Sequence, residues 1–159
     1  MEELSLILAD EREALERLQF ALETERLVLA SGRTRWLMRA AKGVEDVLEE
    51  LRTVEVMRAV AADQAAEALG LESNPSLQVL ADAADEPWRT ILLDHHTAFV
   101  STVHEITDLA ENNRELITSG YTSARETLLA LGKGAEGYSP DGTAAVIAST
   151  PHRLVDRTL

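Results

Sequence analysis

Three histidines that lie close together in the sequence are the first candidates for chemistry. His95, His96 and His104 fall within ten residues, and imidazole is a common metal ligand. On a helix, paired ligands stand at positions i and i+4, whereas His96 and His104 are eight residues apart, or about 12 Å along the axis. The Glu-x-x-His pairs of di-iron helical bundles are also missing from the sequence. We therefore expect histidines on the surface, in water, and no metal site.

A catalytic centre is equally hard to assemble from this sequence. A nucleophile needs an adjacent base that a third group orients, and the serines and threonines of the chain show no recognisable nucleophile elbow. The run Gly132-Lys133-Gly134 lacks the spacing of a phosphate-binding loop and follows a helical pattern rather than a strand. These observations predict a protein without enzymatic activity and without a cofactor.

Charge and composition narrow the class of partner. The chain carries 28 Asp and Glu against 15 Lys and Arg, a formal net charge of -13, which repels phosphate backbones and disfavours nucleic acid. It has no cysteine, which excludes disulfides and thiolate metal sites. The start Met1-Glu2-Glu3 lacks a basic signal-peptide region, and no run approaches the ~20 apolar residues of a membrane span. We expect a cytoplasmic protein that does not insert into a membrane.

The elements that must position any binding residue are helices. Residues 2–30 have leucines at seven-residue intervals, but Glu11 and Glu25 interrupt the alternate positions of the same stripe, which favours an irregular bundle over a symmetric zipper. Ser31-Gly32 offers a break. The heptad leucines are Leu8, Leu15, Leu22 and Leu29.

The remaining pattern predicts a second long helix, a short one and a third long one. The second helix is expected from about Arg33 to Leu69 with Gly70 as its stop, and a short amphipathic segment over residues 74–83. The last helix is expected to start at Asp85-Glu86-Pro87, with Pro in its first turn, and to end at Gly132. Its predicted apolar face includes Trp88, Leu92, Phe99, Val103, Ile106, Ala110, Ile117, Ala124, Leu128 and Leu131.

Together these elements predict an all-α fold, an elongated antiparallel helical bundle or coiled coil of three long helices plus one short helix. The helical body is expected to occupy residues 1–132. Residues 133–159 contain three glycines and two prolines, which indicates a flexible C-terminal tail. These are Gly134, Gly137, Gly142, Pro140 and Pro151.

Helix length gives a clue to the binding surface. At ~1.5 Å per residue the three long helices span about 44, 55 and 67 Å, so the last helix is expected to outrun a hairpin made by the first two. Apolar residues on that overhang, Ile117, Tyr121, Leu128, Leu129 and Leu131, cost roughly 25 cal/mol per Å² in water. They are therefore expected to fold back, to self-associate as a homo-oligomer or to receive a partner's helix.

Three further features leave alternatives open. Arg33, Arg35, Arg39 and Lys42 form a basic cluster without an intervening acid, which is either a solvated face or a device that steers an acidic partner segment. Asn113 lies in the apolar stripe of the last helix, either as a register device or as a contact for a bound chain. Tyr138 stands among Gly and Pro, where little core can bury it, and is a candidate for an external contact.

Several of these segments resemble the FlgN-like flagellar export chaperone family. The resemblance rests on the Leu-rich first helix, on the run Asn112-Asn113-Arg114-Glu115-Leu116-Ile117 in the last helix, and on the Tyr-x-x-x-Gly element of Tyr138 to Gly142. It implies a cytoplasmic chaperone of type III protein export that binds C-terminal helical segments of hook-filament junction (hook-associated) proteins. Such a chaperone delivers these segments to the export gate during biogenesis of the bacterial flagellum.

The resemblance also implies positions for the two contacts. The substrate protein would bind Asn113, Leu116, Ile117, Tyr121, Ala124 and Leu128. The export gate would contact Tyr138, whereas the stretch after Gly142 departs from the family pattern. The runner-up is a generic helical adaptor or coiled-coil scaffold from another pathway, and a four-helix metal enzyme is a weaker third reading. Which junction protein is bound, and the oligomeric state, stay open.

Overall fold

A computed structural model of the chain describes residues 1–133. Its helical elements are α1 (Glu2–Ala30), a 3₁₀ turn η1 (Thr34–Trp36), α2 (Leu37–Leu69), α3 (Leu77–Ala83) and α4 (Trp88–Lys133). The predicted all-α fold with three long helices and one short helix is confirmed for the described part of the chain. These residues belong to two compact units, Met1–Ile117 and a second that begins at Thr118. The predicted boundary between a body at 1–132 and a tail at 133–159 stays a prediction, because 134–159 lie outside the described residues.

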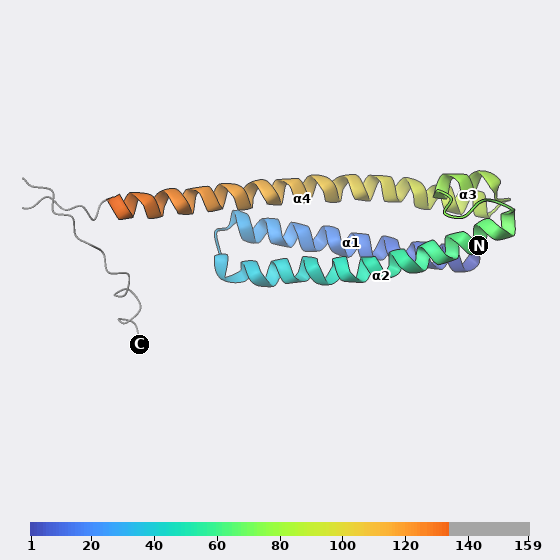
Figure 1. Ribbon diagram of the computed structural model, residues 1–159, viewed down its shortest axis with the longest axis horizontal. Coiled ribbons are helices and arrows are strands. Elements are labelled where there is room, and N and C mark those ends of the chain that lie inside the picture. Colours follow the sequence, from blue (N-terminus) through green and yellow to red (C-terminus); the bar gives the residue numbers. More distant parts are fainter. Residues whose placement is uncertain (134–159) are drawn as a thin grey trace, which may run out of the picture. The chain divides into compact units, whose positions relative to one another are not determined.

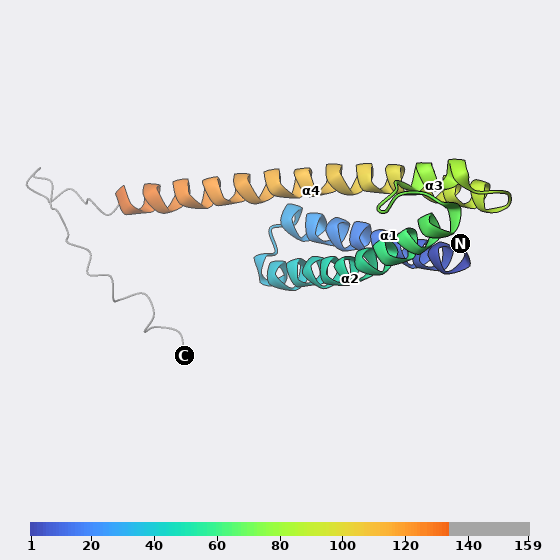
Figure 2. The ribbon, with the colours of Figure 1, turned by 45° about the vertical axis from the view of Figure 1, so that its right-hand side comes forward.

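Within the first unit, α1 and α2 form an antiparallel hairpin (Figure 1, Figure 2). The hairpin turns at Gly32, whose φ of +66° is readily adopted by glycine. Arg33 follows with φ -83° and ψ 67°, outside the helical region, and residues Thr34–Trp36 form η1 before α2 begins at Leu37. The predicted start of the second helix at about Arg33 is therefore wrong. The chain reverses its direction over residues 32–36, and α2 begins only at Leu37.

The C-terminus of α2 ends as predicted at Gly70. Gly70 is left-handed, with φ 70° and ψ 27°, and its N–H donates to the main-chain oxygen of Glu67 at 3.1 Å. The N–H of Leu71 donates to the oxygen of Ala66 at 2.9 Å. This pair of bonds is a Schellman cap, which satisfies carbonyls that the helix end leaves without partners.

The short helix α3 is shorter than expected, because it starts at Leu77 rather than at Asn74. Ser76 is its N-cap, and its Oγ accepts from the N–H of Val79 at 3.3 Å. Asn74 has a positive φ of 59°, and its N–H donates to Asp63 at 2.6 Å. Asn74 thus belongs to the loop that ties the α2–α3 connection to α2.

Helix α4 starts and ends a little later than predicted. It begins at Trp88, so Pro87 lies before its first turn, and the Glu86 carboxylate accepts from Thr90 Oγ1 at 2.8 Å. Arg89 donates through Nη2 to the main-chain oxygen of Asp82 at 2.9 Å, which ties α4 to the end of α3. The helix runs one residue beyond Gly132, so this glycine does not terminate it.

Two apolar clusters hold the first unit together. The larger joins α1, the alanine-rich end of α2, α3 and the start of α4, and its fully buried large side chains are Leu4, Leu8, Leu80 and Leu92. The alanines of α2 let neighbouring helices approach closely: Ala61, Ala62, Ala65 and Ala66. The second cluster contains Leu18 and Leu22 of α1 and Leu109 of α4, with partly buried residues of α2 against it.

The buried face of α4 differs in part from the predicted one. Leu109 is buried, whereas Val103 is 49% exposed and Ala110 is exposed. Burial follows Phe99, Thr102, Ile106, Leu109 and Asn113, which are alternating steps of three and four residues. A heptad-like seam of this kind stays on one face of the helix, whereas steps of four drift away from it.

Candidate protein-binding surfaces

The predicted substrate-contact residues share one face of α4. Asn113, Ile117, Tyr121, Ala124 and Leu128 follow one another at steps of four, four, three and four residues, which places them in one stripe along a helix. Leu116 stands beside the stripe. All six residues of the predicted set thus lie on a single helix, α4.

Exposure changes sharply along this stripe. Asn113 is 2% exposed, whereas Ile117 is 48% and both Tyr121 and Leu128 are 70% exposed. Ala124 is also exposed. In the first unit the set is buried at Asn113 and half exposed at Ile117, and in the second unit Tyr121, Ala124 and Leu128 are exposed to solvent.

Asn113 contacts α1 through two hydrogen bonds. Its Nδ2 donates to the main-chain oxygen of Leu22 and to the carboxylate of Glu25, each at 2.9 Å. Its Oδ1 is buried and accepts no hydrogen bond. Of the two alternatives for this residue, the register device fits these contacts, because a polar pair in an apolar seam fixes how two helices align. The exposed members of the set are the ones available to a partner.

The histidines of α4 do not share one environment. His95 is half-buried rather than solvated as predicted, and its ring stacks on Phe99 with the centroids 6.1 Å apart. Burial lowers the pKa of His95, and the positive charge of Arg12 lowers it further. His104 is exposed, with Nε2 3.7 Å from the carboxylate of Asp108. Residues 1–133 contain no group of three His, Cys, Asp or Glu side chains placed to hold a metal ion.

A second apolar surface, which the sequence did not reveal, lies between α1 and α2 near their turn. It is a groove of about 430 Å³. The groove is lined by side chains of α1, η1 and α2: Arg17, Phe20, Ala21, Thr24, Val28, Trp36, Arg39, Ala40, Gly43 and Val47. Three signals in the sequence could have pointed to it: Phe20 off the leucine stripe, Trp36 beside the turn, and Gly43 inside a helix.

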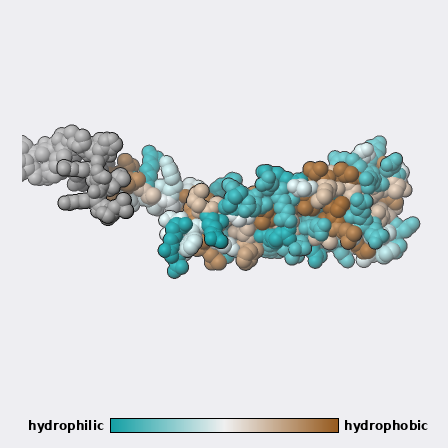
Figure 3. Space-filling view, turned by 90° about the horizontal axis from the view of Figure 1, so that it is seen from below, coloured by the Kyte–Doolittle hydropathy of each residue, from teal (hydrophilic) through white to brown (hydrophobic). Residues whose placement is uncertain are grey.

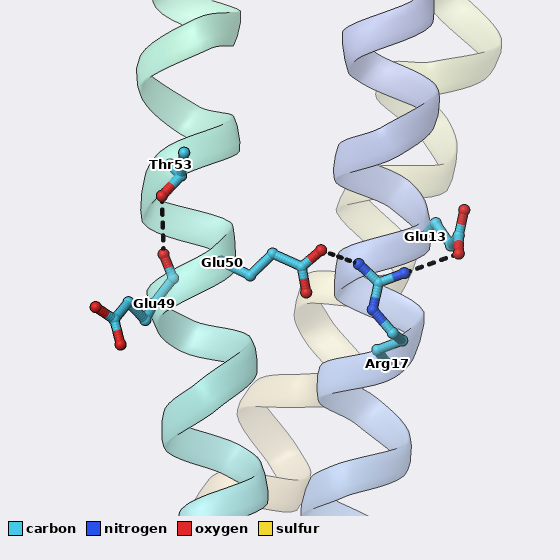
Figure 4. A network of polar contacts seen from close by, with 5 residues as sticks. All are labelled: Glu13, Arg17, Glu49, Glu50 and Thr53. Carbon is cyan, nitrogen blue, oxygen red and sulfur yellow. Dashed lines mark hydrogen bonds and ion pairs between the residues drawn. The ribbon is translucent and has the colours of Figure 1, made fainter.

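The basic side chains around this α1–α2 groove differ in their partners. Arg17 donates through Nη1 to Glu13 at 2.8 Å and also pairs with Glu50 on α2 (Figure 4). The guanidinium of Arg35 lies 5.2 Å from the centroid of the Trp36 ring, as a cation-π contact. Lys42 donates to Asp46 at 2.6 Å, and this bond raises the pKa of Lys42. Arg39 makes no ion pair with any residue in the described part of the chain.

Apolar side chains also interrupt the hydrophilic surface elsewhere. In Figure 3 brown hydrophobic areas lie among teal hydrophilic ones on the face shown. None of the described helices is long and apolar enough to cross a membrane. Tyr138, the predicted contact for the export gate, lies outside the described residues 1–133.

Residues 1–145 match the FlgN protein family, which covers the helices described here. The chain belongs to the FlgN family. FlgN proteins are cytoplasmic, non-enzymatic export chaperones for the hook-associated proteins FlgK and FlgL. No curated protein and no solved structure matches the chain significantly. Family membership confirms the predicted chaperone function. It also rules out the two alternatives, a generic helical adaptor from another pathway and a metal enzyme.

Proposed function

We propose that this FlgN-family chaperone receives the C-terminal helical segment of a hook-associated protein on the exposed apolar stripe of α4. The single observation that carries the proposal is the exposure of large apolar side chains on one face of α4 in the second unit, where Tyr121 and Leu128 are each 70% exposed. Leu116, Ile117 and Ala124 complete the contact surface.

The physical reason is the cost of leaving this stripe in water. Each Å² of apolar surface that a partner covers contributes roughly 25 cal/mol. An amphipathic helix is a suitable partner because its own apolar residues repeat at the same three- and four-residue spacing. Binding would cover the apolar residues of α4. It would also keep the C-terminal segment of the hook-associated protein from pairing prematurely with other chains.

The test is calorimetry with C-terminal peptides of FlgK and FlgL. Leu128→Ala is expected to weaken binding at least tenfold, about 1.4 kcal/mol, and to leave the melting temperature unchanged because Leu128 is exposed. Leu129→Ala is the matched control: Leu129 is also exposed, at 56%, but one residue along α4 is about 100° around the helix. A Leu128→Ala variant that melts earlier and binds normally would place the contact elsewhere.

Self-association through the same stripe is the competing use of this surface. Sedimentation of the chain without peptide separates the two. If Leu128→Ala converts an oligomer to a monomer, and the peptides bind both forms equally, the stripe is an interface between copies of this chain rather than a site for cargo.

We also propose that Tyr138 contacts the export gate. The support is its position among Gly137, Pro140 and Gly142, together with its place inside the family match over residues 1–145. Tyr138→Ala is expected to reduce binding to the gate and export of hook-associated proteins, with unchanged melting temperature and peptide affinity. A variant that is markedly less stable, or normal in both gate binding and filament assembly, would overturn this assignment.

A further inference from the structure

We propose that the α1–α2 groove is a second protein-binding site, which takes an acidic amphipathic helix of a partner other than the hook-associated cargo. All residues that line it belong to α1, η1 and α2, so it shares none with the stripe on α4. The proposal stands apart from the proposed function.

The lining supplies the apolar half of the argument. Phe20 is 73% exposed and Trp36 is 43% exposed, although large aromatic rings are among the side chains that gain most from burial. Val28 and Val47 extend the apolar surface on the two helices. Aromatic anchors beside a groove are typical of the residues that dominate protein-protein binding.

Gly43 is one of the residues that line the groove, and it leaves open space there. It lies inside α2, where glycine is unfavourable for helix stability. A Cβ placed there meets no heavy atom within 4 Å, so no close approach within the chain requires a glycine at this position. The missing side chain leaves space against which a partner's side chain could pack.

Charge identifies the kind of helix that fits. Residues 32–43 contain Arg33, Arg35, Arg39 and Lys42 and no acid, on a chain with a net charge of -13. Arg39 lines the groove without an acidic partner among residues 1–133. Carboxylates on the flanks of a bound helix would pair with this cluster and speed its approach. A basic helix would meet repulsion at the same place.

The test of this proposal measures the fluorescence of Trp36, which lines the groove. The chain has two tryptophans, so in the Trp88→Phe variant Trp36 is the one that remains. The probe is a synthetic helix of roughly 18 residues, five turns, with a Leu stripe flanked by Glu. A second peptide carries Lys in place of Glu. We expect the Glu peptide to shift Trp36 emission to the blue and to bind at least tenfold more tightly than the Lys peptide, less so at high salt. Calorimetry with the unsubstituted chain gives the same comparison if Trp88→Phe disturbs the fold.

Substitutions in the groove locate the site. Gly43→Leu fills the open space and Arg39→Glu reverses the free charge, and each is expected to weaken the Glu peptide at least tenfold with retained helicity. Arg52→Glu is the matched control, since Arg52 is an exposed arginine of α2 outside the groove. Cargo peptides of FlgK and FlgL are expected to bind the two groove variants normally, and the Glu peptide to bind Leu128→Ala normally.

Four results would overturn the proposal. If Trp36 emission responds to neither peptide, the groove is not a docking site. If it responds equally to both peptides, the charge of the groove does not select an acidic helix. Self-association that Gly43→Leu abolishes makes a second copy of the chain the occupant. Loss of cargo-peptide binding in Arg39→Glu assigns the groove to the hook-associated protein itself.

Discussion

Asn113 of α4 donates one amide hydrogen to the main-chain oxygen of Leu22 and the other to the carboxylate of Glu25, both on α1 and both at 2.9 Å. Asn113→Asp would place a second carboxylate against Glu25 in a buried position. We expect a loss of about 2 to 3 kcal/mol in the free energy of unfolding. Urea denaturation at neutral pH measures it. Asn112→Asp is the control, because Asn112 is exposed and directly precedes Asn113 in the same helix. An equal loss of unfolding free energy in both variants would refute the explanation.

Two leucines of α1 that lie two residues apart, on opposite faces of the helix, test the larger core cluster. Leu8 is 0% exposed and Leu6 is 64% exposed. Leu8→Ala is expected to cost about 2 to 5 kcal/mol, since it leaves a cavity in the larger core cluster, and Leu6→Ala to cost less than about 0.5 kcal/mol. Thermal and urea unfolding measure both. If both variants lost similar amounts of unfolding free energy, Leu8 would not be the residue of this pair that α1 buries in the core.

Glu11 predicts a pH dependence of stability. Burial raises the pKa of Glu11 above 4.5, the nearby Glu55 raises it too, and the charge of Arg58 opposes them. The Glu11 carboxylate lies 3.0 Å from Arg58 Nε without the alignment of a hydrogen bond. A raised pKa means that the folded state holds the proton more tightly, so this contribution to stability is present below pH 4.5 and is lost as pH rises through the folded pKa.

Glu11→Gln removes that titration. The stability of the Gln variant minus that of the unsubstituted chain is therefore expected to increase from about pH 4 to about pH 7. Urea titrations at the two pH values measure it, and the comparison is internally controlled because other groups cancel in the difference. A difference that decreases with pH would show that the attraction of Arg58 outweighs burial.

Two glycines of the hairpin predict opposite effects of the same substitution. Gly43 lies inside α2 with open space around a Cβ, so Gly43→Ala is expected to raise the free energy of unfolding by about 0.5 to 1 kcal/mol. Gly70 caps the helix at φ 70°, so Gly70→Ala is expected to lower it by about 1 kcal/mol or more. Thermal unfolding separates the two. A stabilising Gly70→Ala would mean that the cap relaxes easily.

Local signals in the sequence predicted half of the helix boundaries. Residues 2–30 and the stop at Gly70 were correct, because an apolar period and a left-handed cap depend on neighbours a few residues away. The starts of α2, α3 and α4 were placed too early, by one to four residues. Here the deciding contacts, such as Ser76 capping Val79 and Asn74 bonding to Asp63, compete with helix propensity and depend on how the loops fold.

Long-range pairs could not be predicted in this way. The acids that break the leucine stripe, Glu11 and Glu25, were recognised as imperfections, but their partners Arg58 and Asn113 lie on other helices. The groove was missed for the same reason, since Phe20 and Gly43 come together only when α1 pairs with α2. The predicted contact surface on α4 stays a prediction, and its large apolar side chains Ile117, Tyr121 and Leu128 are exposed.

The exposure of α4 after Ile117 also bears on how firmly a cargo is held. Every side chain from Thr118 to Leu131 is exposed, and a helical stretch of this length without tertiary cover is marginally stable in water. Its amide hydrogens are therefore expected to exchange with solvent much faster than those of α1 and α2, where exchange requires opening of the packed core. Part of the interaction free energy with a partner would go into ordering these turns, which lowers affinity below what the covered area alone would give. An export chaperone must release its cargo, and a binding surface of this kind favours release.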